Sequence, residues 1–224
     1  MGIIKQGILG GFSKKVGSVV GTSWKGIAVM KSMPLSVVNP KTTAQVNQRN
    51  AFKLTALVAS AMLTPTIQDC WNRWAKRMSG YNAFIKTNVD IMKAQASNLG
   101  AFLTNMIVSN GELTLPSLSG TTSAGENSIT FNATWDDNAV GGKFDKSSDI
   151  VVIGALYIPD KDGEADLDGM RCIYAEGVAR TAGATSITVN LQAEDDSAFP
   201  FMFVKSADGY FRSENLNFYS KIHG

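Results

Sequence analysis

The sequence is poor in the residues on which most catalytic sites depend. Its 224 residues include a single histidine, His223. Because His223 is the penultimate residue, Ser-His-Asp and Cys-His triads are not expected. A single histidine also excludes zinc sites that need two histidine ligands. No G-x-x-x-x-G-K-[ST] phosphate-binding loop occurs either. We therefore expect a protein that is not an enzyme and that holds no cofactor.

Cysteine is nearly as scarce, with only Cys70 and Cys172 in the chain. The two lie 102 positions apart, so the chain contains no CxxC pair of the kind found in structural zinc sites and thioredoxin-like redox proteins. One long-range disulfide is conceivable, but two buried free thiols are the preferred interpretation.

Long apolar runs are absent. Lys5, Lys14 and Lys15 interrupt the apolar N-terminal stretch, so it lacks the roughly 7–15 uninterrupted apolar residues of an export signal. Nothing approaches the roughly 18 apolar residues of a membrane span. The sequence predicts no signal peptide and no transmembrane segment, with synthesis in the cytoplasm.

Acidic residues are almost missing from the first hundred positions. Residues 1–100 carry thirteen Lys and Arg but only Asp69 and Asp90, a net charge of +11. Residues 101–224 carry eight basic and seventeen acidic residues, a net charge of −9. Two halves of opposite net charge indicate that at least one of them binds a partner. The alternative is two separately solvated surfaces.

Glycine spacing and apolar periodicity divide the first hundred residues into two parts. Residues 1–38 are rich in glycine and β-branched residues, which predicts an extended arm of short strands that orders when packed against something. Residues 39–100 predict a basic helical domain, a small bundle of three helices. The expected helices run from Asn39-Pro40 to Met62, from Thr64-Pro65 to Arg77, and from Tyr81 to Gln95.

The helical spacing of apolar residues ends near residue 100. Residues 101–224 predict an acidic domain of about seven short strands. Asn110-Gly111 between two apolar runs is a strong hairpin signal. The fold class is therefore predicted as α+β, with an antiparallel β-sandwich of immunoglobulin-like kind after the helices. Further strands are expected at 128–135, 150–158, 172–179, 186–191, 199–205 and 215–219.

One acidic loop is a weak candidate for a metal site. Alternating carboxylates at Asp160, Asp162, Glu164, Asp166 and Asp168 resemble a Ca²⁺ loop. An EF-hand register places Ala165 where Gly belongs and Arg171 where the closing Glu belongs. We therefore expect a solvated hairpin loop and no bound metal.

Basic and aromatic residues mark the surfaces expected to bind partners. The candidate interaction residues are Lys14, Lys15, Trp24, Lys25, Arg49, Lys53, Arg73, Lys76 and Arg77. Basic helices near Trp71, Trp74 and Tyr81 allow nucleic-acid binding. However, these aromatics have the spacing of core residues, and the acidic half would repel a polyanion. A third hypothesis is a carbohydrate-binding or adhesive β-module with sugar platforms at Trp135, Tyr157, Tyr210 and Phe211.

Several motifs of the first 90 residues resemble a known family. They are Gly10-Gly11-Phe12-Ser13-Lys14-Lys15-Val16-Gly17-Ser18-Val19-Val20-Gly21, then Ser23-Trp24-Lys25-Gly26, then Asn39-Pro40-Lys41-Thr42, and Ser79-Gly80-Tyr81-Asn82-Ala83-Phe84. They are similar to an uncharacterised family of Bacteroidota genomes and their phages, with Lys14 standing where glycine is expected. The resemblance implies a phage-type structural component and supplies no catalytic residues.

These observations favour a non-enzymatic virion structural protein, associated with the capsid, a head fibre or the tail. The glycine-rich arm and basic helices are expected to dock on a neighbour, which is another copy of the chain or another virion protein. Opposed charges suit such head-to-tail contacts. Nucleic acid is a less favoured partner, no membrane is expected, and the expected location is the virion.

Overall fold

The computed structural model describes residues 3–4, 12–36, 39–95, 98–193 and 196–217. The chain divides into two compact units, Met1–Thr42 and Thr43–Gly224, called the N-terminal unit and the main unit below. This division differs from the predicted one. The expected boundary near residue 100 falls inside the main unit, because the helices and the strands share one hydrophobic cluster.

The N-terminal unit is an antiparallel meander of four strands. These are β1 (Ile3–Ile4), β2 (Phe12–Val16), β3 (Val19–Trp24) and β4 (Ile27–Ser32), in that order across the sheet. Lys25 and Gly26 both have positive φ in the two-residue turn between β3 and β4, as tight hairpins require. The short extended segments expected in this arm are present.

The first part of the main unit, residues 43–105, contains four helices and one irregular helical turn. They are α1 (Thr43–Ala61), the turn η1 (Leu63–Ile67), α2 (Gln68–Trp71), α3 (Gly80–Ala94) and α4 (Leu99–Asn105). Ser79 caps α3 by accepting a hydrogen bond from Asn82 N, and Asn98 caps α4 in the same way from Ala101 N. The first and third predicted helices are confirmed within a few residues. The second ends at Trp71, earlier than expected.

The β part of the main unit contains two larger sheets and a small hairpin. The five-stranded sheet has the order β10-β7-β13-β14, with β11 also paired to β7, and the three-stranded sheet has the order β12-β6-β5. All pairings between the strands are antiparallel. The strands are β5 (Ser117–Gly125), β6 (Ser128–Asp136), β7 (Ile150–Ile158), β8 (Asp160–Lys161), β9 (Glu164–Ala165), β10 (Arg171–Tyr174), β11 (Val178–Ala179), β12 (Ala184–Asn190), β13 (Ser197–Lys205) and β14 (Leu216–Asn217).

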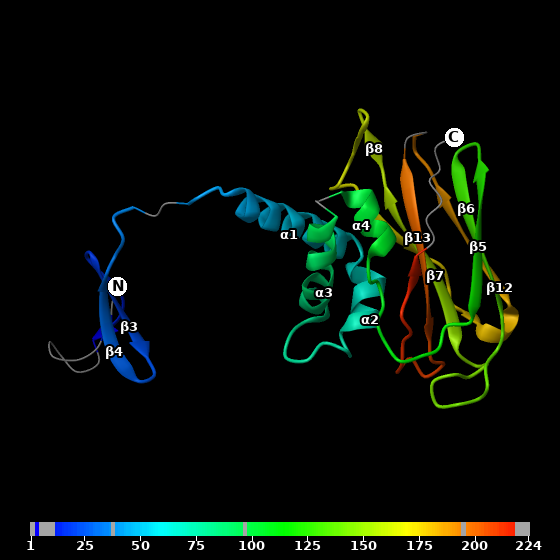
Figure 1. Cartoon of the computed structure of the whole chain (residues 1–224), viewed down its shortest axis with the longest axis horizontal. Helices are drawn as coiled ribbons and strands as arrows, with labels where there is room; N and C mark the ends of the chain where they lie inside the picture. The colour runs from blue at the N-terminus through cyan, green and yellow to red at the C-terminus, as the bar shows by residue number, and fades with distance from the viewer. Residues whose placement is uncertain (1–2, 5–11, 37–38, 96–97, 194–195, 218–224) are drawn as a thin grey trace. The chain divides into compact units, whose positions relative to one another are not determined.

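The paired strands β7 and β13 are buried on both faces. Successive residues of β7 alternate between two hydrophobic clusters, with Val152 and Leu156 in one and Val151 and Ile153 in the other. The first cluster also contains the helices, and the second contains β6 and β12. Figure 1 shows the helices on one side of β7 and β13, with β5, β6 and β12 on the other. Because both faces of these strands are buried, nearly every residue of β7 and β13 is apolar.

Two details of the predicted fold are corrected by this arrangement. A separate three-helix bundle is not evident, because the apolar faces of the helices also pack on the five-stranded sheet through Phe201 and Phe203. The prediction of a hairpin at Asn110-Gly111 is wrong, since no strand pair flanks these residues. Leu113 instead forms an isolated β-bridge with Ser213. The mixed α+β class is confirmed, whereas an immunoglobulin-like topology is not established by the strand order.

Two of the buried charged side chains, Arg180 and Asp196, connect loops of the β part. Arg180, which is fully buried, pairs with Asp137 at 3.2 Å and with Asp145 at 2.8 Å. It also donates to Asn138 Oδ1 at 2.7 Å and to the Thr114 carbonyl oxygen at 3.2 Å. One guanidinium therefore ties together the segments around residues 114, 137 and 145.

Asp196 is the second of these two side chains. Its carboxylate accepts hydrogen bonds from the Tyr157 hydroxyl and from the backbone N–H groups of Asp160, Gln192 and Ala193. Burial alone would raise the pKa of Asp196, but these four hydrogen bonds outweigh burial and lower the pKa below its ordinary value.

Candidate functional site

The N-terminal unit presents large apolar side chains to solvent. Trp24 is 62 % exposed and Met30 is 69 % exposed, and every residue of β4 is exposed. Gly21 is the one buried residue within 12–36 and 39–42, the part of this unit for which burial is described. We call the exposed set the meander surface, which comprises Val16, Trp24, Ile27, Val29, Met30 and Met33. It includes both faces of the sheet, because alternation along β4 places Met30 on the face opposite to Ile27 and Val29.

The predicted basic residues of this unit lie beside that surface. Lys14 and Lys15 are exposed on β2, and the Lys25 ammonium lies 4.9 Å from the centre of the Trp24 ring. Lys14 has a φ of 76°, a conformation that favours glycine. This explains why glycine is expected at position 14 by the family resemblance. A lysine there is accommodated at a strained backbone position.

Strand β4 forms an open edge of the meander. In the described part of the N-terminal unit it pairs with β3 alone, so its outer edge carries unpaired backbone N–H and C=O groups. Exposed edges of this kind pair readily with strands of other chains.

The predicted basic residues of the main unit come from helix α1 and from the segment between α2 and α3. Arg49 and Lys53 are exposed on α1, while Lys76 and Arg77 are exposed in the segment between α2 and α3. Arg73 makes different contacts. It donates to the Gly209 carbonyl oxygen at 2.5 Å, and its guanidinium lies 5.0 Å from the centre of the Tyr210 ring.

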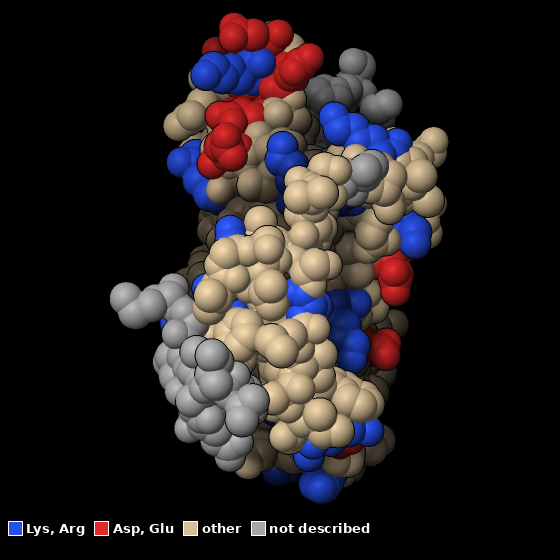
Figure 2. Space-filling view, turned by 90° about the vertical axis from the view of Figure 1, so that its left-hand side faces the viewer, with Lys and Arg blue, Asp and Glu red and all other residues tan. Residues whose placement is uncertain are grey.

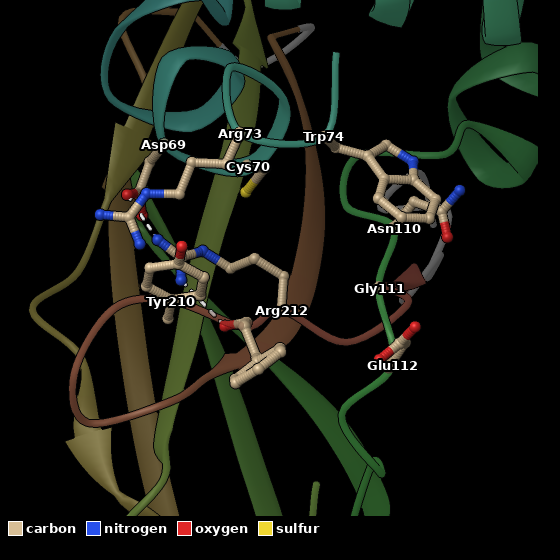
Figure 3. Close-up of a pocket in the computed structure, with 10 residues that line it drawn as sticks. Asp69, Cys70, Arg73, Trp74, Asn110, Gly111, Glu112, Tyr210 and Arg212 are labelled. Atoms are coloured by element: carbon tan, nitrogen blue, oxygen red, sulfur yellow. Dashed lines mark hydrogen bonds and ion pairs between the residues drawn. The ribbon is translucent and has the colours of Figure 1, made fainter. Parts of the chain in front are cut away.

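A pocket of about 190 Å³ lies in the main unit where α2 meets the 209–212 segment. Figure 3 shows Trp74, Asn110 and Glu112 on one side, Asp69, Arg73 and Tyr210 on the other, and Cys70 and Arg212 between them. Arg212 is only 7 % exposed and pairs with Asp69 at 2.6 Å. We call this the α2 pocket.

Two of the predicted sugar platforms are wrong. Trp135 is buried and donates its ring N–H to the Arg180 carbonyl oxygen, and Tyr157 is buried against Asp196. Their rings belong to the core between the two sheets, so neither can stack on a ligand. Phe211 is half-buried, whereas Tyr210 is 67 % exposed in the α2 pocket.

Sequence reasoning missed the role of Trp74 as a surface aromatic. Its spacing of three residues from Trp71 indicates a shared helical core face, but α2 ends at Trp71. Trp74 therefore falls outside the helix and is 48 % exposed in the α2 pocket. A helix that ends early could be anticipated only from tertiary contacts.

The acidic loop forms the predicted hairpin, with β8 paired to β9. Asp160 accepts a hydrogen bond from Gly163 N, and Asp166 accepts from Asp168 N and Gly169 N. Within the described ranges, no three His, Cys, Asp or Glu side chains lie close enough together to hold a metal ion. Figure 2 shows acidic side chains gathered at the top of the view, with basic ones among them.

Both cysteines are free thiols in the structure. Burial raises the pKa of Cys70 to about 12 and that of Cys172 to about 11. Such thiols stay protonated at neutral pH and are poor nucleophiles, although Cys70 lines the α2 pocket.

No helix in the described part of the chain is long and apolar enough to cross a membrane. Neither a curated protein nor a solved structure shows significant similarity to the chain. The sequence does match one family over residues 11–216, which includes the meander from β2 onward, the helices and both larger sheets. The chain belongs to this family, which is described as a family of unknown function (DUF6266).

Proposed function

We propose that the chain is a non-enzymatic assembly protein whose N-terminal unit docks on the main unit of another copy. The observation that carries this proposal is the meander surface. Strands β2, β3 and β4 expose large apolar side chains such as Trp24 and Met30, and Gly21 is the one buried residue among those of the unit whose burial is described. Exposed apolar surface of this kind is typical of an interface that a partner covers.

The charges of the two units support a copy of the same chain as that partner. Residues 1–42 contain six lysines and no acidic residue, a net charge of +6. Residues 43–224 contain fifteen basic and nineteen acidic residues, a net charge of −4. Opposite charges attract the N-terminal unit of one copy to the main unit of the next, whereas two N-terminal units repel each other.

The open edge of β4 supports docking by main-chain hydrogen bonds in addition to apolar contact. A strand that pairs on one side only can accept an added strand from a neighbour. A contact between two different surfaces repeats from copy to copy, which generates rings or longer assemblies. Assembly in many copies is what a virion structural component requires, and the virion assignment itself rests on the family resemblance of residues 1–90.

The proposal is tested by measuring the mass of the full-length chain with light scattering after size-exclusion chromatography. We expect oligomers at about 0.05 M salt that weaken at about 0.5 M salt, because salt screens the attraction between opposite charges. Met30→Asp should reduce the oligomer strongly, since it places a charge in the meander surface. Met30→Leu is the matched control, because it keeps an apolar side chain of similar size at the same exposed position and should leave the mass unchanged.

A monomer at every salt and protein concentration, or equal effects of Met30→Asp and Met30→Leu, would count against the proposed docking.

One observation favours nucleic acid as a second candidate partner. A hollow of about 330 Å³ between α2 and α3 is lined by Trp74 and Met78 together with Lys76 and Lys86. An exposed aromatic among basic residues suits stacking on an unpaired base. The other aromatics expected to take part are less available, since Trp71 is buried and Tyr81 is half-buried.

A further inference from the structure

We propose that the α2 pocket binds the single ring of a neutral sugar, such as the end residue of a glycan chain. This site is separate from the meander surface and does not depend on the assembly function. It differs from the sugar platforms expected from the sequence, because Trp135 and Tyr157 are buried and Trp74 takes their place.

The aromatic walls provide the apolar contact that a sugar ring needs. Trp74 is 48 % exposed and borders the pocket on one side, with Tyr210 on the other (Figure 3). The Arg73 guanidinium lies over the Tyr210 ring at 5.0 Å and fixes its orientation. Trp74 is therefore the ring available for stacking, and Tyr210 forms the opposite wall.

Within the described ranges, the polar groups of the pocket include both acceptors and donors without partners, among the donors the buried Nε–H of Arg212. In the described part of the chain, the Glu112 carboxylate and the Asn110 side-chain amide have no hydrogen-bond or ion-pair partner, and Asp69 uses only Oδ1. A ligand that fits must therefore both donate and accept hydrogen bonds. The hydroxyl groups around a sugar ring do so while the ring keeps an apolar face for Trp74.

The charge balance favours a neutral ligand over an ion. Arg73 and Arg212 supply two positive charges, and Asp69 and Glu112 supply two negative charges. Arg212 is already paired with Asp69 and is almost wholly buried, so it cannot serve as a free anion receptor. A phosphate or carboxylate would face Glu112, and an ammonium group would face Arg73.

Size limits the ligand to one ring. The pocket volume of about 190 Å³ is below the roughly 300–1,000 Å³ of sites that enclose drug-sized ligands. A nucleotide or a disaccharide would extend beyond it, whereas one pyranose ring with its hydroxyl groups matches the space.

The backbone around the pocket is fixed before any ligand binds. Leu113 N donates to the Arg212 carbonyl oxygen at 3.0 Å, which joins the 110–113 segment to the 209–212 segment. A side chain at Gly111 would collide with the same carbonyl group, so only glycine allows this close approach. A prearranged site loses little entropy on binding.

The test uses the full-length chain and saturation-transfer NMR with methyl glucoside, methyl galactoside, methyl mannoside and N-acetylglucosamine. Choline and inorganic phosphate are the charged probes. We expect saturable binding of at least one sugar with a Kd on the order of 1 mM, as befits a ligand of few atoms. Trp74→Ala and Glu112→Gln should each weaken that binding by about tenfold or more.

Trp24→Ala is the matched control, because Trp24 is also an exposed tryptophan but lies outside the pocket. Circular dichroism of each variant confirms that it is folded. The proposal is overturned if no sugar binds saturably, if choline or phosphate binds in preference to the sugars, or if Trp74→Ala binds sugar as the native chain does. Oligomer mass is measured separately, so failure here leaves the assembly proposal standing.

Discussion

Gly154 on β7 lies directly opposite Phe201 on β13, and a Cβ atom at position 154 would come within 2.5 Å of the Phe201 ring. The ring occupies the space that a side chain at 154 would need. Phe201 belongs to the hydrophobic cluster shared by the helices and the five-stranded sheet. A glycine in the middle of a central strand therefore allows a large aromatic side chain to pack between the helices and the sheet.

Gly154→Val should destabilise the main unit by about 1–3 kcal/mol, because the added side chain overpacks the cluster around Phe201. Urea unfolding followed by circular dichroism measures the change. Gly142→Ala is the control, since a Cβ at Gly142 meets no atom within 4 Å and its φ is not in the left-handed region. Equal stability of the two variants would contradict the packing described for Phe201.

Arg180→Ala should lower the free energy of unfolding by about 3–5 kcal/mol, because it leaves Asp145 without its buried partner and removes the link between three segments. Arg171→Ala is the matched control. Arg171 is an exposed arginine whose guanidinium lies 4.4 Å from the centre of the Tyr157 ring, and its loss should cost less than about 1 kcal/mol. Thermal unfolding at neutral pH distinguishes the two, and a mild effect of Arg180→Ala would show that the buried network is dispensable.

Asp196→Asn should destabilise the protein at pH 7 by about 1–3 kcal/mol, because four donors lose a charged acceptor. The pKa of Asp196 is lowered in the folded state, so its contribution is complete above the ordinary carboxyl pKa and is lost as pH falls through the folded value. The stability difference between the native chain and the variant should therefore shrink below about pH 4. A difference that stays constant between pH 7 and pH 3 would contradict a carboxylate held in this way.

The native thiols should react slowly with Ellman's reagent at pH 8, because burial holds the pKa of both cysteines well above that pH. Two thiols should react rapidly once the chain is unfolded in guanidinium chloride. Rapid reaction of one thiol in the native chain would show that Cys70 or Cys172 is more accessible than the structure indicates.

Short apolar runs and apolar–polar alternation made several strands predictable. β7 was expected at 150–158 and has those bounds, and β6 and β13 were expected within two residues of theirs. β5 was missed because Ser, Thr and Gly make up most of its residues, so it has no apolar alternation. α4 was missed because the helical periodicity was taken to end at Asn98-Leu99-Gly100. Asn98 in fact caps this helix, and Gly100 lies within it.

The α2 pocket illustrates what local sequence cannot supply. Its residues come from positions 69–74, 110–112 and 210–212, which tertiary packing brings together. Asn110-Gly111 has the composition of a hairpin turn, but Gly111 is required for close approach to the Arg212 carbonyl group. The aromatic content of the β half was recognised, yet which rings are buried depends on how the two sheets pack.

The central claim is that the chain assembles with itself through its N-terminal unit, and its mass distribution in solution tests this most directly. Sedimentation velocity of the full-length chain at low and at physiological salt, with and without a short DNA, reports both self-association and nucleic-acid binding. We predict oligomers in both samples, with no DNA co-sedimenting at physiological salt, because the acidic main unit repels a polyanion. A monomer alone, converted to a salt-sensitive complex by sub-micromolar DNA, would contradict the account and favour the nucleic-acid alternative.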